Sequence, residues 1–143
     1  FHAKRPEDPM TESQLNEARL EAIRVAVAEL RAEYAEVLPG LVSDLTVATE
    51  RACASAVDAE IEHARTLVHR IRGAAGSYGF KRVSERAAVI EDLLYERERA
   101  RAPFDALLRD RVLAGLAELR ATTASELIEL APPKPDDPGG VPG

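Results

Sequence analysis

His69-Arg-Ile-Arg-Gly-Ala-Ala-Gly-Ser-Tyr-Gly-Phe80 is the stretch of this sequence that decides most about the chain. Residues three and four apart are neighbours on a helix surface. A helix through this stretch therefore places a histidine, an arginine and two glycines on one face: His69, Arg72, Gly73 and Gly76. An imidazole that another protein must reach to exchange a phosphoryl group needs this arrangement, because glycine leaves room for the approach and a guanidinium attracts the anion.

The sequence before this stretch predicts a long amphipathic helix. Thr11 and Ser13 are candidate N-caps, and Pro39-Gly40 interrupts the pattern that follows. Proline inside a helix removes a hydrogen bond and clashes with the preceding turn, which favours a break or a strong kink near residues 38–40. The apolar stripe continues across this point at steps of three and four, so a kink stays open as the alternative: Leu20, Ile23, Val27, Leu30, Tyr34, Leu38, Leu41 and Leu45.

Three further helices are predicted from the same periodicity. Asp58 is a candidate cap for the helix that carries His69, whose apolar positions are Ile61, Ala64, Val68, Ile71, Ala75 and Tyr78. His69 lies roughly 130° from the middle of that stripe, so it should face solvent. The next two stripes begin at Val83 and Phe104, and no segment alternates with period two. We therefore predict an all-α, up-and-down four-helix bundle with an additional or kinked N-terminal helix.

Composition narrows the classes of function. The 143 residues carry a formal net charge of −6 and no long run of lysine or arginine, which argues against nucleic acid and anionic membranes as partners. The single cysteine, Cys53, allows no intramolecular disulfide and is expected in the core. No apolar stretch is long enough to span a bilayer. We expect a cytoplasmic protein that does not insert into membranes, either a monomer or a module of a larger protein.

The His69–Gly73 motif, with Gly79 ten residues after the histidine, resembles the signature of the histidine phosphotransfer (HPt) family. That family usually has His-x-x-Lys-Gly, small residues and a later glycine on a helix of a four-helix bundle. Glu91 on the following helix resembles the end of the family pattern. The resemblance covers roughly residues 28–130, and its specific part is residues 68–91. The run Gly76–Phe80 also resembles the phosphotransfer domain that begins chemotaxis histidine kinases.

The resemblance implies a role for each matching residue. His69 would be phosphorylated on the ring nitrogen farther from the backbone, and Arg72, where the family usually has lysine, would stabilise the phosphoryl group. The residues implied in partner docking are Arg65, Gly73, Gly76, Ser77 and Gly79. The chain would be a phosphocarrier in a two-component phosphorelay, not an enzyme in its own right. It would need no cofactor, because Mg²⁺ would be held by the partner, a response-regulator receiver domain, and a histidine kinase is the other expected partner.

On this interpretation residues 1–10 are a tag or linker, residues 11–131 form the HPt bundle, and residues 132–143 are a Pro/Gly-rich tail or linker. Two alternatives come from other classes. One is a helical bundle that binds partners without chemistry, for which His69 would be dispensable. The other is a metal-dependent bundle enzyme, because Glu60 and His63 have the Glu-x-x-His spacing of di-iron carboxylate proteins. Such sites use the motif twice, whereas it occurs here once, since residue 66 is a threonine.

Overall fold

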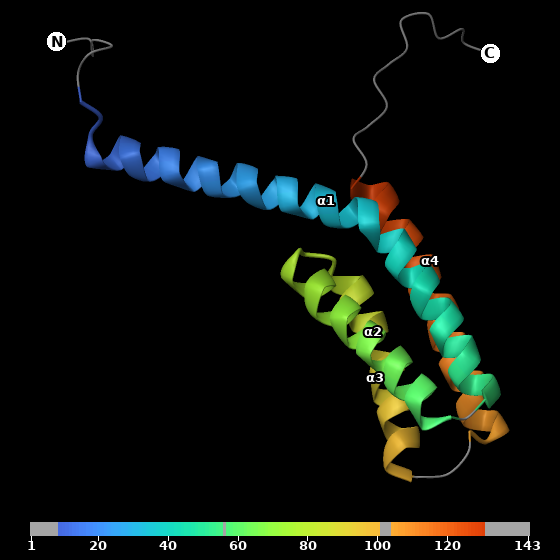
Figure 1. Cartoon of the computed structure of the whole chain (residues 1–143). Coiled ribbons are helices and arrows are strands. Elements are labelled where there is room, and N and C mark those ends of the chain that lie inside the picture. The colour runs from blue at the N-terminus through green and yellow to red at the C-terminus, as the bar shows by residue number, and fades with distance from the viewer. Residues whose placement is uncertain (1–8, 56, 101–103, 131–143) are drawn as a thin grey trace, which may run out of the picture.

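The computed structural model describes residues 9–55, 57–100 and 104–130. This part of the chain forms four helices: α1 (Glu12–Ser55), α2 (Asp58–Ser77), α3 (Lys81–Ala100) and α4 (Ala106–Leu130). α1 and α3 each pack against both α2 and α4, and successive helices run in opposite directions (Figure 1). The predicted all-α, up-and-down four-helix bundle is therefore confirmed.

Only the second half of α1 belongs to the bundle. Tyr34 is the first buried residue of this helix, and the half before it projects away from the other helices (Figure 1). The apolar stripe continues along both halves, but it meets the core only from Tyr34 onward. Its first four members remain exposed: Leu20 (53%), Ile23 (59%), Val27 (52%) and Leu30 (47%).

Pro39 lies inside α1, which runs without interruption from Glu12 to Ser55. Of the break or strong kink predicted near residues 38–40, the break is therefore wrong. In Figure 1 the ribbon changes direction in this region, where the projecting half joins the half that packs in the bundle. This agrees with the kinked alternative, because proline costs one backbone hydrogen bond and displaces the turn before it without ending the helix.

The helix starts show which capping predictions were right. The Thr11 hydroxyl accepts the Gln14 N–H at 3.1 Å, and the Gln14 side chain accepts the Thr11 N–H at 3.0 Å, so Thr11 caps α1 as predicted. Asp58 does not cap α2, because Val57 occupies the N-cap position and its side chain makes no capping bond. Asp58 is instead the first helical residue, and its carboxylate pairs with Arg97 of α3 at 3.0 Å.

A short turn between α2 and α3 closes one end of the bundle. Gly79 adopts φ +84°, a conformation that favours glycine, and the next residue, Phe80, is completely buried. The Phe80 ring packs against Tyr34 with centroids 5.8 Å apart, which connects this turn to α1. In α2 the predicted apolar face is buried at Ile61, Ala64, Val68, Ile71 and Ala75, and Tyr78 is half-buried. This burial fixes the rotation of α2 and turns His69 outward.

Within the described ranges, no helix is both long enough and apolar enough to cross a membrane.

Candidate functional site

His69 stands in the middle of α2 with its side chain 75% exposed, as the sequence predicts. Its Nδ1 atom lies 2.5 Å from Oε2 of Glu91, which projects from α3. The Glu91 side chain is only 13% exposed, so the packing of α2 against α3 holds its carboxylate in place. The histidine is therefore reachable from outside, while one of its two ring nitrogens is occupied from within the bundle.

Arg72 binds the same carboxylate. Its Nη1 atom lies 2.6 Å from Oε1 of Glu91, and the arginine side chain is 46% exposed. Glu91 therefore uses one oxygen for the imidazole and the other for the guanidinium, and both contacts are short. Because a guanidinium carries five N–H donors, this contact leaves others for a further anion beside His69.

The Glu91 carboxylate determines which ring nitrogen of His69 carries the proton. A carboxylate accepts hydrogen bonds and does not donate them, so the proton of a neutral His69 ring belongs on Nδ1. The lone pair is then on Nε2, the ring nitrogen farther from the backbone. Contact with Glu91 thus orients the ring and leaves the lone pair on Nε2.

The two helical glycines near His69 have different surroundings. A Cβ atom built on Gly73 meets no heavy atom within 4 Å among the described residues, apart from its neighbours along the helix. A Cβ atom on Gly76 would lie 3.2 Å from the Ser84 hydroxyl of α3, and that hydroxyl donates to the Arg72 carbonyl at 2.8 Å. Packing of α3 thus accounts for Gly76, whereas no contact within the described chain accounts for Gly73.

The remaining predicted docking residues lie around this face. Gly79 has a structural role in the α2–α3 turn, and Ser77 is exposed at the end of α2. Arg65, one turn before His69, is half-buried and contacts Glu98 of α3 at 3.0 Å. None of these three residues contacts His69, Arg72 or Glu91 in the described contacts, and a Cβ atom on Gly79 would lie closest to Arg31 of α1.

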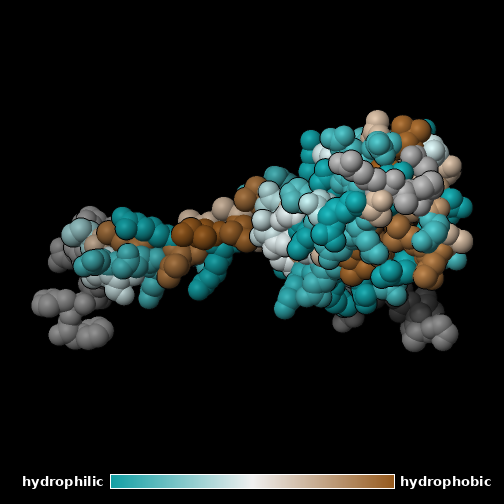
Figure 2. Space-filling view, turned by 90° about the horizontal axis from the view of Figure 1, so that it is seen from below, coloured by the Kyte–Doolittle hydropathy of each residue, from teal (hydrophilic) through white to brown (hydrophobic). Residues whose placement is uncertain are grey.

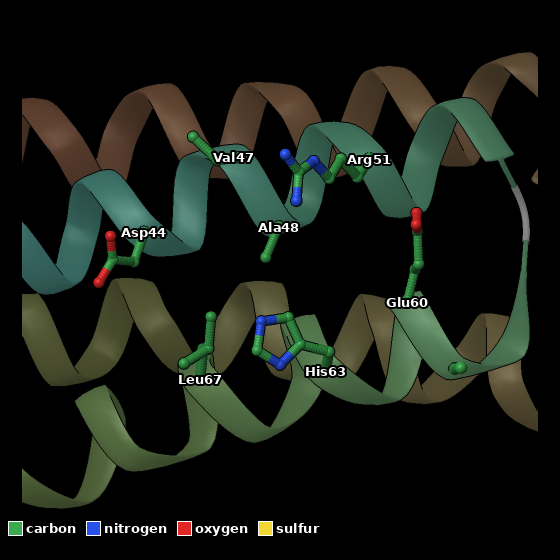
Figure 3. Close-up of a pocket in the computed structure, with 8 residues that line it drawn as sticks. Asp44, Val47, Ala48, Arg51, Glu60, His63 and Leu67 are labelled. Carbon is green, nitrogen blue, oxygen red and sulfur yellow. The ribbon is translucent and has the colours of Figure 1, made fainter.

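His63 lies on a different side of α2 from His69. It lines a groove between α1 and α2, in which Arg51 of α1 lies across from His63 while Asp44 of α1 and Glu60 of α2 lie toward opposite ends (Figure 3). Charges of both signs face this groove. Among the described residues, no group of three or more His, Cys, Asp or Glu side chains is arranged to hold a metal ion.

Cys53 is buried at 3% exposure in α1, as predicted. Burial raises the pKa of its thiol, and Glu50 adds to the rise, while Arg109 acts against it. The thiol is thus disfavoured as an anion, which argues against a nucleophilic role.

A family model described as the Hpt domain matches residues 25–122, which is well over half of the 143-residue chain. The chain belongs to the Hpt domain family. Hpt domains carry phosphoryl groups on histidine in two-component phosphorelays, and they do so with kinases and receiver domains. Neither the comparison with curated proteins nor that with solved structures gives a match. The chemotaxis-kinase subtype stays a prediction.

The match covers most of the four-helix bundle. The matched range contains the His69–Arg72–Glu91 cluster and begins within the projecting half of α1. Glu91 is the site residue to which sequence reasoning assigned no role. It lies 22 positions from His69, on another helix, and only the family pattern pointed toward it.

Proposed function

We propose that His69 is the phosphorylated residue of this Hpt domain and that its Nε2 atom accepts the phosphoryl group. The observation that supports this most directly is the Nδ1–Glu91 contact at 2.5 Å, beside an imidazole that is 75% exposed. In the transfer, Nε2 attacks the phosphorus of an aspartyl phosphate, the N–P bond forms, and the P–O bond to the aspartate breaks. The aspartate leaves as a carboxylate, and the return reaction reverses these steps.

Glu91 contributes to this reaction through the charge on the ring. Phosphorylation at Nε2 places positive charge on the imidazole while the proton stays on Nδ1. The carboxylate that accepts this proton's hydrogen bond stabilises the charged product and the transition state leading to it. Glu91 is thus a positioning residue, since it acts through the imidazole and touches no reacting atom.

Arg72 and Gly73 serve the incoming group in this proposal. The guanidinium, partly exposed and held beside His69 by Glu91, neutralises the phosphoryl oxygens. Gly73 leaves α2 without a side chain one turn from the histidine, where a receiver domain needs close access. The receiver supplies the Mg²⁺ and the carboxylates that transfer requires, and a histidine kinase is the other partner. The cytoplasmic location expected from the sequence is part of this proposal.

The test is phosphoryl transfer from a panel of phosphorylated receiver domains and autophosphorylated kinases to the wild-type chain, His69→Gln and His63→Gln. His63→Gln is the matched control, because His63 is also exposed on α2 but lies at the α1–α2 groove. Acid-labile, base-stable label on wild type and His63→Gln, and none on His69→Gln, is the expected result. Label that persists in His69→Gln would assign the site elsewhere.

A measurement of receiver binding, added to this experiment, decides between this proposal and a bundle that binds partners without chemistry. If a receiver binds wild type and His69→Gln equally, and neither chain gains label from that receiver in its phosphorylated form, the non-catalytic alternative is correct. If binding is equal and only wild type gains label, binding and transfer are separate properties of one surface, as the proposal requires.

A further inference from the structure

The projecting half of α1, residues 12–30, forms an arm. One face of this arm is an apolar seam that no other described residue covers. Leu20, Ile23, Val27 and Leu30 are each about half exposed. Figure 2 shows hydrophobic residues running along the arm on the face seen from below. Their steps of three, four and three residues are the a and d positions of a heptad, the pattern by which helices form coiled coils.

The bundle covers this seam only from its next positions onward. The Arg31 guanidinium lies over the Phe80 ring, 5.1 Å from its centroid. Tyr34, the next seam residue, packs against Tyr78 with centroids 5.1 Å apart. The α2–α3 turn thus covers the continuation of the seam, and the arm projects beyond it (Figure 1).

Phosphotransfer does not account for the arm. The Hpt match begins at residue 25, so the first part of the arm lies outside it. The His69–Arg72–Glu91 cluster uses only α2 and α3. An exposed a/d seam on a helix that the phosphotransfer site does not use indicates a surface for association with another helix.

We propose that the arm pairs with the arm of a second copy of this chain, in antiparallel orientation. A parallel coiled coil pairs each g position with the e position of the next heptad. Here that would oppose Glu12 to the partner's Glu17 and Arg19 to the partner's Arg24, two like-charge pairs on each side. It would also bring both bundles to the same end of the paired helices.

The antiparallel arrangement removes both conflicts. When residues 13–30 of the two copies overlap completely, Leu20 lies opposite the partner's Ile23, and Glu17 faces the partner's Arg24. The two bundles then lie at opposite ends, and the start of each arm reaches the α2–α3 turn of the other copy. Toward the ends of the overlap Ser13 and Asn16 replace apolar residues, so the association should be reversible. The proposed dimer differs from the monomer that, with a module of a larger protein, was expected from the sequence.

The test is sedimentation equilibrium of the full chain over a range of concentrations, with two variants of the arm. Ile23→Glu places a charge in the seam. Val25→Glu is the matched control, because Val25 is also exposed, at 47%, but lies about 200° around the helix from Ile23. We expect wild type and Val25→Glu to dimerise reversibly and Ile23→Glu to stay monomeric. Wild type that stays monomeric up to about 1 mM, or Ile23→Glu that dimerises like Val25→Glu, would overturn the proposal.

Charge exchange tests the orientation. Glu17→Arg opposes two arginines in the antiparallel pair and should weaken the dimer at least several-fold, and adding Arg24→Glu should restore it. In a parallel pair the new arginine would meet the partner's Glu12, so a stronger dimer in Glu17→Arg would overturn the antiparallel assignment. The circular dichroism of each variant shows whether the helices are retained.

Discussion

Gly73→Ala should make this protein more stable and a poorer phosphocarrier. Glycine inside a helix costs about 0.5–1 kcal/mol relative to alanine. The added Cβ meets no heavy atom within 4 Å among the described residues, apart from its neighbours along the helix, so no strain offsets this gain. For a domain of this size the gain corresponds to a rise in melting temperature of about 2–5 °C.

The same methyl group should obstruct a docked receiver, because it stands one turn from His69 on the exposed face of α2. Overpacking by one methyl group typically costs about 1–3 kcal/mol, which is roughly a 5- to 150-fold loss in the rate of transfer at limiting receiver concentration. Gly40→Ala is the matched control, since Gly40 is also an exposed helical glycine with open space around its Cβ position. It should gain similar stability and transfer at the wild-type rate.

The assay combines thermal unfolding by circular dichroism with the initial rate of label gain from a phosphorylated receiver. A higher melting temperature with an unchanged rate of transfer in Gly73→Ala would refute the reasoning. It would show that the close approach of a receiver does not require glycine at position 73. A lower melting temperature would show instead that Gly73 is needed for folding.

Three further predictions follow from the contacts described above. Glu91→Ala removes the acceptor shared by His69 and Arg72. Since a hydrogen bond to a charged group is worth about 1.5–3 kcal/mol, transfer should slow by roughly 10- to 150-fold. An unchanged rate of transfer would show that the carboxylate does not support the reaction. The buried Tyr34 hydroxyl has no hydrogen-bond partner in the described part of the chain. Tyr34→Phe should therefore leave the free energy of unfolding, measured by urea titration, unchanged or raise it by up to about 1 kcal/mol. A decrease in the free energy of unfolding of more than about 1 kcal/mol would reveal a partner of the hydroxyl. Burial raises the pKa of the Cys53 thiol from its ordinary value of 9.0, so the stability from the neutral thiol is present below that pH and is lost as the pH rises through the folded-state value. Urea midpoints should therefore fall less in Cys53→Ala than in wild type between about pH 8 and pH 11, and equal falls would count against this.

Periodicity alone predicted the helices because each apolar stripe in the bundle has one face to bury. It placed Val68 and Ile71 in the core, and His69 outside it followed from the helical repeat. Periodicity could not show that the part of the α1 stripe before Tyr34 lies outside the bundle. The sequence pattern of an apolar helix face is the same whether or not another helix of the chain covers that face. The break at Pro39 was predicted from the chemistry of proline, whereas the continuing apolar stripe was consistent with the uninterrupted helix that the structure shows.

The site residues that share α2 were predictable from the sequence, whereas the contact between α2 and α3 was not. His69, Arg72 and Gly73 share a face by spacing, and that is visible in the sequence. The contact with Glu91 depends on how α3 packs against α2, over a separation of 22 residues, which periodicity does not determine. The same packing explains Gly76 through Ser84, so two glycines that look alike in the sequence have different surroundings in the structure.

Long-range ¹H–¹⁵N NMR correlations of the His69 ring, recorded before and after phosphoryl transfer, test the central claim most directly. The contact with Glu91 predicts a proton on Nδ1 in the unphosphorylated protein and the phosphoryl group on Nε2 afterwards. The phosphoryl group on Nδ1, or on His2 or His63 while His69 stays unmodified, would contradict the account.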